Sequence, residues 1–199
     1  MMKKLPKQMF IIMILCAITA FGYTRPAINI HLSFFGETRT TSLSLATVFE
    51  DSESPLNNLN VGQSDLSDMA GGDGFMEDVM GRVVLSVVAY LATFVLLLAI
   101  FMITLFGKLK KTKIVMLAIA LILIIVSGTT ILTVPEIITD SLTACLGFLA
   151  LFINVADLLS ISLGVGYWII LSTLAVMLLI EISTFFITLR TRTGEALTE

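Results

Sequence analysis

The chain has 199 residues, of which 57% are hydrophobic and only 14% are charged, and its mean hydropathy is +1.00. Soluble domains average roughly 45–50% apolar and about 25% charged residues, so the composition excludes an ordinary soluble domain and predicts an integral membrane protein. The net charge is −3, and we expect no nucleic-acid partner. One histidine and two cysteines leave too few ligands for a metal or haem site, and we expect no cofactor.

The first apolar segment, residues 1–23, carries three lysines ahead of a short apolar run that ends at Tyr23. This pattern fits either a cleaved secretory signal or an uncleaved signal anchor. We favour the anchor, which is then the first transmembrane helix. Tyr23 is expected to anchor its outer end in the aromatic belt at the membrane interface.

Residues 24–82 are predicted to form an extracytoplasmic loop. Within it, residues 27–49 alternate apolar and polar side chains around a Gly-containing turn, which predicts a β-hairpin. Two strands alone are only marginally stable, so the hairpin should rest on the outer helix ends or on a partner. His31 is interpreted as a strand-surface residue rather than a pH sensor. Residues 50–78 are acidic but lack EF-hand spacing, so we expect a solvated flexible loop rather than a calcium site.

Two long apolar segments follow, residues 83–107 and 114–134, and each is long enough for a transmembrane helix. Lysines fill the short gap between them, as they precede the first span, and arginines follow the last span. Short loops rich in Lys and Arg stay on the cytoplasmic side. Both termini are therefore predicted to be cytoplasmic, in what we expect to be a bacterial cytoplasmic membrane.

Residues 136–162 are predicted to form an amphipathic helix, because apolar residues recur every three or four positions. The helix either lies at the outer interface or crosses as a fifth span. The charge rule favours the first placement and hence four spans. A small and polar stripe on this helix is interpreted as an interaction surface and includes Asp140, Gly147, Asn154 and Asp157.

Residues 163–189 are predicted to form the last transmembrane helix, followed by a cytoplasmic tail, residues 190–199. Tyr167 and Trp168 are expected at its outer interface, in the aromatic belt. The Gly-Val-Gly ahead of them faintly resembles a potassium-channel filter. The next span begins at once, however, so we interpret these residues as a glycine turn between helices.

Glu181 is an ionisable residue within the apolar run of the last span. An intramembrane carboxyl group is costly unless it faces the bundle or takes up a proton, and polar residues on its helical face favour an inward orientation. No Lys or Arg falls within the predicted spans, so we expect no salt bridge inside this chain. The predicted intramembrane polar site comprises Glu181, Thr173, Thr184 and Thr188 of the last span with Tyr90 and Thr93 of the second.

Three roles for Glu181 remain open at this stage. A protonated Glu181 hydrogen-bonded to threonines or to a backbone carbonyl would hold helices together, and this role is favoured. The others are a proton or cation site, and a counter-charge for a basic residue on another subunit.

The order of segments resembles the claudin-type tetraspan architecture: one span, an outer loop with strands, two spans joined by a tight basic turn, another outer loop and a last span. The Trp-Gly-Leu-Trp motif and two loop cysteines of claudins are absent. The run "RPAINIHLSFFGETRTTSLSLATVF" before a long span resembles the membrane module of the paraquat-inducible protein A family, without its cysteine-rich zinc ribbons. Both resemblances imply an architecture and no activity.

We therefore expect an all-α membrane protein, a four-transmembrane-helix bundle with a small outer β-hairpin and an amphipathic interfacial helix. No pair of nucleophile and base suggests an enzyme. The expected function is that of an accessory or scaffolding subunit, in contact with the lipid bilayer and with another membrane-protein subunit or further copies. The alternative is a small oligomeric transporter or channel in which Glu181 binds a proton, a cation or a lipid head group.

Overall fold

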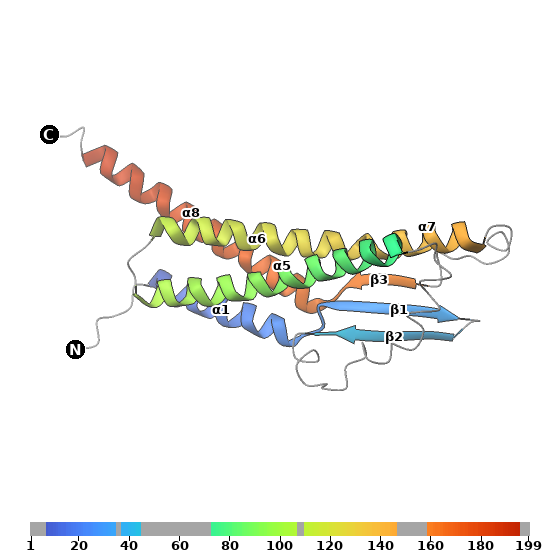
Figure 1. Cartoon of the computed structure of the whole chain (residues 1–199). Helices are drawn as coiled ribbons and strands as arrows, with labels where there is room; N and C mark the ends of the chain where they lie inside the picture. The colour runs from blue at the N-terminus through green and yellow to red at the C-terminus, as the bar shows by residue number, and fades with distance from the viewer. Residues whose placement is uncertain (1–6, 35–36, 45–72, 107–109, 147–158, 196–199) are drawn as a thin grey trace.

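The computed structural model describes residues 7–34, 37–44, 73–106, 110–146 and 159–195. These residues form a helical bundle with a three-stranded antiparallel sheet at one end (Figure 1). The elements in chain order are α1 (Lys7–Thr24), β1 (Ile28–Phe34), β2 (Glu37–Leu43), α5 (Asp73–Phe106), α6 (Lys110–Leu132), α7 (Val134–Leu146), β3 (Leu159–Leu163) and α8 (Val165–Glu195).

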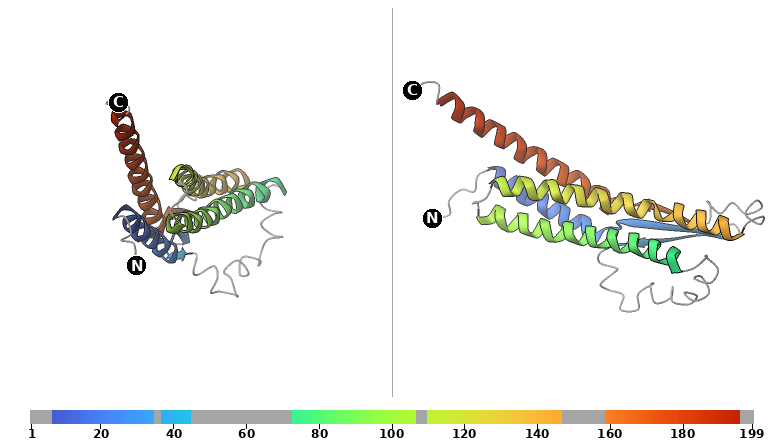
Figure 2. Two further views of the ribbon diagram at one scale, coloured as in Figure 1. Left: turned by 90° about the vertical axis from the view of Figure 1, so that its left-hand side faces the viewer. Right: turned by 45° about the horizontal axis from the view of Figure 1, so that its top comes forward.

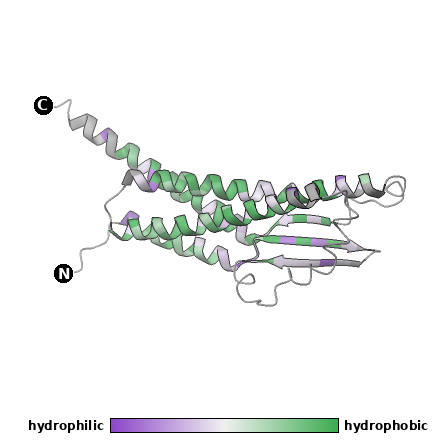
Figure 3. Ribbon diagram, in the orientation of Figure 1, coloured by the Kyte–Doolittle hydropathy of each residue, from purple (hydrophilic) through white to green (hydrophobic). Residues whose placement is uncertain are grey.

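Four stretches of the described helices are long and apolar enough to cross a membrane, judged by length and composition. Figure 3 shows apolar residues along most of each long helix, polar residues at the helix ends, and a mixture of apolar and polar residues in the strands. One end of the bundle holds the start of α1, the end of α5, the start of α6 and the end of α8. The sheet lies at the other end (Figures 1 and 2). The four stretches are Lys7–Thr24, Asp78–Phe106, Thr112–Ser141 and Val165–Ile187.

The core of the bundle lies where α8 packs against α1 and α6, and where α5 packs against α6. The outward sides of the same helices are also apolar, as Val95 (62% exposed) and Phe106 (70% exposed) illustrate. Helices that are apolar all round are typical of membrane spans or of the core of a larger protein. The core residues with no exposed surface include Ile100, Leu117, Ile124, Ile170, Leu174 and Met177.

Helices α6 and α7 are nearly continuous, and they are separated by a turn at Thr133. Pro135 explains the break, because proline lacks an N–H and its ring clashes with the backbone of the preceding turn, but it is accepted in the first turn of a new helix. As a result, α7 extends the line of α6 beyond the bundle and runs alongside the sheet (Figure 1).

The sheet has the strand order β2-β1-β3, so β1 pairs on both sides. The predicted hairpin is confirmed, with Ile28 opposite Leu43 and Phe34 opposite Glu37. The third strand was not predicted. It supplies the support that two strands alone lack, since a sheet of three strands packed on helices is more stable than a lone hairpin.

The prediction of one amphipathic helix over residues 136–162 was wrong at its end. Helix α7 accounts for its first part, but residues 159–163 form β3, and the intervening residues lie outside the described part of the chain. The glycine turn therefore leads from a strand to a helix rather than from helix to helix. Because α7 contacts β3 and β3 pairs with β1, the segment begins and ends at the sheet end, and the described residues contain no fifth crossing.

Close backbone contacts join the sheet to the bundle at the start of α8. Gly164 N–H donates to the carbonyl of Ala27 (2.8 Å), and Gly166 N–H donates to the carbonyl of Pro26 (2.9 Å). A Cβ at residue 164 would lie 2.2 Å from the carbonyl oxygen of Pro26, so only glycine fits there. The start of α8 and the end of α1 thus hold the sheet directly on the helical bundle.

Candidate functional site

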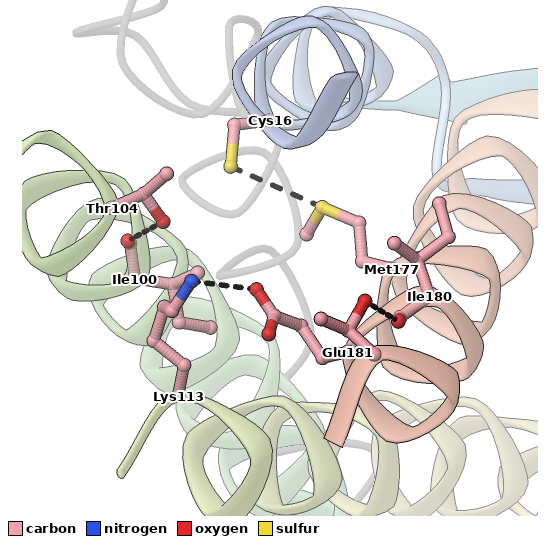
Figure 4. A network of polar contacts seen from close by, with 8 residues as sticks. Cys16, Ile100, Thr104, Lys113, Met177, Ile180 and Glu181 are labelled. Atoms are coloured by element: carbon pink, nitrogen blue, oxygen red, sulfur yellow. Dashed lines mark hydrogen bonds and ion pairs between the residues drawn. The ribbon is translucent and has the colours of Figure 1, made fainter. Parts of the chain in front are cut away.

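The most unusual feature of the bundle interior is an ion pair between Lys113 of α6 and Glu181 of α8. The Lys113 ammonium lies 2.6 Å from Glu181 Oε1, and the two side chains are only 11% and 7% exposed. Figure 4 shows them facing each other between the helices. The expectation that this chain contains no internal salt bridge to Glu181 was therefore wrong.

The error has a simple structural cause. The predicted span began at residue 114, whereas α6 begins at Lys110 and includes Lys113 in its first turn. The four-carbon stem of a lysine carries its ammonium group several ångströms from the backbone, so a lysine at a helix end can reach a buried carboxylate. The position of Lys113 in the sequence put it outside the span, but its side chain turns into the bundle.

The pair changes how the three roles proposed for Glu181 are weighed. A buried charge is retained when it is paired, and Lys113 supplies the counter-charge from the same chain. Glu181 is 5% exposed, so it is not presented to another subunit. Its evident role is to join α6 to α8 across the core.

All four long helices contribute to the surroundings of this pair (Figure 4). Cys16 of α1 lies with its sulfur 3.9 Å from that of Met177, one helical turn before Glu181. Thr104 of α5 is buried and donates to the carbonyl of Ile100 (2.7 Å). The pair therefore lies in a mixed environment of sulfur atoms, aliphatic side chains and one self-satisfied hydroxyl.

The predicted polar residues of α8 that the structure describes make different contacts along the helix. The hydroxyl of Thr173 is buried and lies 2.9 Å from that of Thr19 on α1. Thr184 is half-buried and donates to the carbonyl of Ile180 (2.8 Å), and the side chain of Thr188 lies outside the described residues. The stripe thus contacts different helices at successive levels.

The predicted residues of α5 are also buried but belong to other contacts. Thr93 has no exposed surface and donates to the carbonyl of Ala89 (2.8 Å). Tyr90 packs against Tyr23 of α1, with ring centroids 4.9 Å apart. Neither is among the residues drawn around the Lys113–Glu181 pair in Figure 4.

A contact that the sequence did not reveal joins α5 to α6. Ser86 Oγ donates to the carbonyl of Ser127, and Ser127 Oγ donates to the carbonyl of Ser86, both at 2.9 Å. Nothing in the sequence aligns the two serines. Reciprocal bonds of this kind let two helices approach closely, as small polar residues do in membrane bundles.

Of the three residues expected as interfacial anchors, two are buried within the protein. Tyr23 is 2% exposed and Tyr167 is 5% exposed, whereas Trp168 is 56% exposed and turns outward. The hydroxyl of Tyr167 donates to the carbonyl of Ile124 (2.9 Å), across a gap that Gly128 keeps open. Because the hydroxyl of Tyr167 has an acceptor, its side chain can be buried in the bundle although the residue lies near the start of a helix.

The predicted interaction stripe of residues 136–162 is only partly within the described structure. Asp140 is exposed on α7. Gly147, Asn154 and Asp157 lie outside the described residues.

A second candidate site is one face of the sheet, the polar sheet face. His31 on β1 lies at its centre, with Nδ1 2.9 Å from Thr40 Oγ1 on β2 and Nε2 3.3 Å from Ser162 Oγ on β3. Opposite residues of paired strands share a face. The register therefore assigns to this face Asn29, His31, Ser33, Thr38, Thr40, Ser42, Ser160 and Ser162.

The polar sheet face carries hydroxyl, amide and imidazole groups, and no carboxylate, ammonium or guanidinium group. Residues 38–42 of β2 are all exposed, so both its polar side chains and its edge are accessible. The opposite face is mainly apolar, with Ile28, Ile30 and Leu32 of β1. The two faces therefore differ sharply in chemistry.

Comparison with protein-family models, with curated proteins and with solved structures gave no match. Among the described residues, no three His, Cys, Asp or Glu side chains come together as a metal site requires. A proposal for function therefore depends on the geometry of the two sites.

Proposed function

We propose that the protein is an integral membrane protein with four spans that acts by contact, as an accessory or scaffolding subunit, and not as an enzyme. In this proposal the surface that makes the contact is the polar sheet face. The observation that carries it is the uncharged face itself, which is half-buried on β1, exposed on β2 and β3, and attached to one end of the bundle.

The attachment of the sheet supports a contact role. Its strands come from two separate segments of the chain. The bonds from Gly164 and Gly166 to Ala27 and Pro26 tie the start of α8 to the link between α1 and β1. A rigid surface loses little conformational entropy on binding, which favours association. With the termini at the opposite end, the sheet would stand on the outer side of a membrane (Figure 1).

The interior supports a structural bundle better than a transporter. Lys113 neutralises Glu181, and the neighbouring core side chains, among them Ile100 and Met177, are apolar. A carrier of protons or cations needs an ionisable group that is accessible in turn from each side. In the described residues, Glu181 is instead buried and paired within the bundle.

The test is a pair of charge substitutions on one strand. Thr38 and Thr41 of β2 are both exposed, but Thr38 lies opposite Ser33 on the polar sheet face and Thr41 lies opposite Ile30 on the other face. We expect Thr38→Lys to reduce association with a partner or a second copy at least tenfold, because an ammonium group would lose water without gaining a counter-charge. Thr41→Lys should leave association unchanged.

The measurement is chemical cross-linking in isolated membranes, followed by mass spectrometry of the gently solubilised protein. Equal loss of association by both variants would reject the polar sheet face as the contact surface. A wild-type chain that remains in the soluble fraction would reject the membrane assignment. A wild-type chain that yields no cross-linked species would reject the contact role.

A further inference from the structure

Two buried tyrosine hydroxyls lack a hydrogen-bond partner in the part of the chain that the structure describes. They belong to Tyr23 of α1 and Tyr90 of α5. The third tyrosine, Tyr167, donates to a backbone carbonyl at 2.9 Å, so the contrast exists within one chain. Buried polar groups almost always have a partner, and a pair of neighbouring exceptions calls for an explanation.

The two tyrosines lie together between α1 and α5. Their ring centroids are 4.9 Å apart at an interplanar angle of 62°, and Tyr23 also meets the ring of Phe94 at 5.0 Å. Tyr23 is 2% exposed, whereas Tyr90 and Phe94 are half-buried, so the cluster reaches the outer surface of the bundle along α5.

The depth of the cluster is the same on both helices. Tyr23 lies 16 residues after the first residue of α1, and Tyr90 lies 16 residues before the last residue of α5. At a rise of about 1.5 Å per residue, each is about 24 Å from the end of the bundle where the termini lie. Since the hydrocarbon core of a bilayer is about 30 Å thick, this depth approaches the boundary between acyl chains and head groups on the sheet side.

The chemistry of the cluster selects a neutral acceptor. Phenolic hydroxyls donate well to a carbonyl oxygen, whereas a phosphate is usually bound by Arg or Lys. The ester carbonyls of glycerolipids lie at the boundary just described, and the carbonyl of a membrane quinone has the same hydrogen-bonding chemistry. The half-buried ring of Phe94 adds an apolar surface beside the hydroxyls.

We propose that Tyr23 and Tyr90 bind the carbonyl oxygen of a membrane lipid between α1 and α5. This inference rests on the proposed membrane embedding. It does not depend on the polar sheet face, which lies outside the bundle.

The test compares thermal unfolding midpoints of the full chain in nanodiscs of two phosphatidylcholines with equal chains, one ester-linked and one ether-linked. The wild type should melt about 2–4 °C higher in the ester lipid, the size expected for one hydrogen bond of ordinary strength in a chain of this length. The combined substitution Tyr23→Phe and Tyr90→Phe retains both rings and should abolish this difference. Addition of a short-chain ubiquinone to the ether discs is a third condition.

Tyr167→Phe is the matched control, because its hydroxyl already has an acceptor in the protein. It should lower the midpoint in both lipids by the same amount and preserve the ester–ether difference. A stabilisation of wild type by ubiquinone in the ether discs, lost in the double variant, would support the site and assign the carbonyl to a quinone.

Equal midpoints of wild type in all three conditions would overturn the lipid site. A double variant whose midpoint differs from that of the wild type by the same amount in every condition would also overturn it, since the two wild-type hydroxyls would then not bind the lipid carbonyl. Failure of the chain to enter nanodiscs at all would instead reject the membrane embedding on which the inference depends.

Discussion

The bundle interior and the sheet both use polar side chains to join segments that are far apart in the chain. In the bundle, Lys113 and Glu181 are separated by 68 residues and are almost inaccessible to water. In the sheet, His31 and Ser162 are separated by 131 residues, and their contact is exposed. The same type of long-range connection therefore occurs in two very different solvents.

The value of a polar contact depends on what replaces it when it is lost. Inside the bundle, nothing replaces it, so a charge or a hydrogen-bonding group is left buried and unpaired. On the sheet, water replaces it at little cost. The bundle contacts are therefore suited to holding the fold, whereas the sheet contacts are available for exchange with a partner.

The largest effect should come from breaking the Lys113–Glu181 pair. Glu181→Leu leaves the Lys113 ammonium beside an apolar core, and removal of one partner of a buried pair typically costs about 3–5 kcal/mol. We expect a correspondingly large fall in the thermal midpoint of the detergent-solubilised protein, with Lys113→Met similarly destabilising.

The combined variant separates loss of the pair from loss of packing. Lys113→Met together with Glu181→Leu leaves no unpaired charge, so most of the lost stability should return. A double variant as unstable as the sum of the single variants would contradict the ion-pair interpretation. The contact would then owe its effect to shape rather than charge.

The sequence predicted the four long apolar helices and the inward orientation of Glu181, but not the partner of Glu181. The length of an apolar run and its helical periodicity depend on local residues. The four long helices and the polar stripe that includes Thr173 could therefore be predicted. The reach of a lysine side chain and the crossing of two helices depend on tertiary packing. For this reason the sequence did not show that Lys113 reaches Glu181, or that Tyr23 and Tyr167 are buried within the bundle.

The third strand has a pattern in the sequence that could have predicted it, but the helical pattern of the preceding residues was given more weight. The sequence Leu-Ser-Ile-Ser-Leu at residues 159–163 alternates with period two, as the strand requires. It follows a longer segment with helical periodicity, and that pattern was extended through it. Its pairing with β1 is a contact between distant segments, which no local pattern specifies.

The next largest effect should come from Gly164, which lies between the two regions. Gly164→Ala would place a Cβ 2.2 Å from the backbone oxygen of Pro26, which cannot move aside without displacing the sheet. Overpacking of this kind costs about 1–3 kcal/mol. We expect a lower midpoint and faster proteolysis in the sheet.

Gly81→Ala is the matched control for this substitution. Gly81 lies in α5 with no atom within 4 Å of an added Cβ, so alanine should be tolerated. Alanine in a helix interior is favoured over glycine by up to about 1 kcal/mol, so the midpoint should hold or rise. Equal destabilisation by both substitutions would contradict the close-contact account of Gly164.

A smaller effect is expected for the serine pair of α5 and α6. Ser86→Ala and Ser127→Ala should each cost about 0.6 kcal/mol and no more than about 1.7 kcal/mol, the average and the maximum measured for hydrogen bonds between membrane helices. Because the two bonds are reciprocal, the double variant should cost less than the sum of the single ones. Additive losses in a double-mutant cycle, followed by thermal unfolding, would show that the serines act independently.

The smallest effect on stability should come from His31, even though it contacts both neighbouring strands. His31→Ala removes two exposed contacts that water can replace, so we expect a loss below about 0.5 kcal/mol. If His31→Ala destabilised the protein as much as Glu181→Leu, the distinction between a structural interior and an exchangeable surface would fail. If His31→Ala instead weakened association without lowering the midpoint, His31 would serve partner binding rather than the stability of the fold.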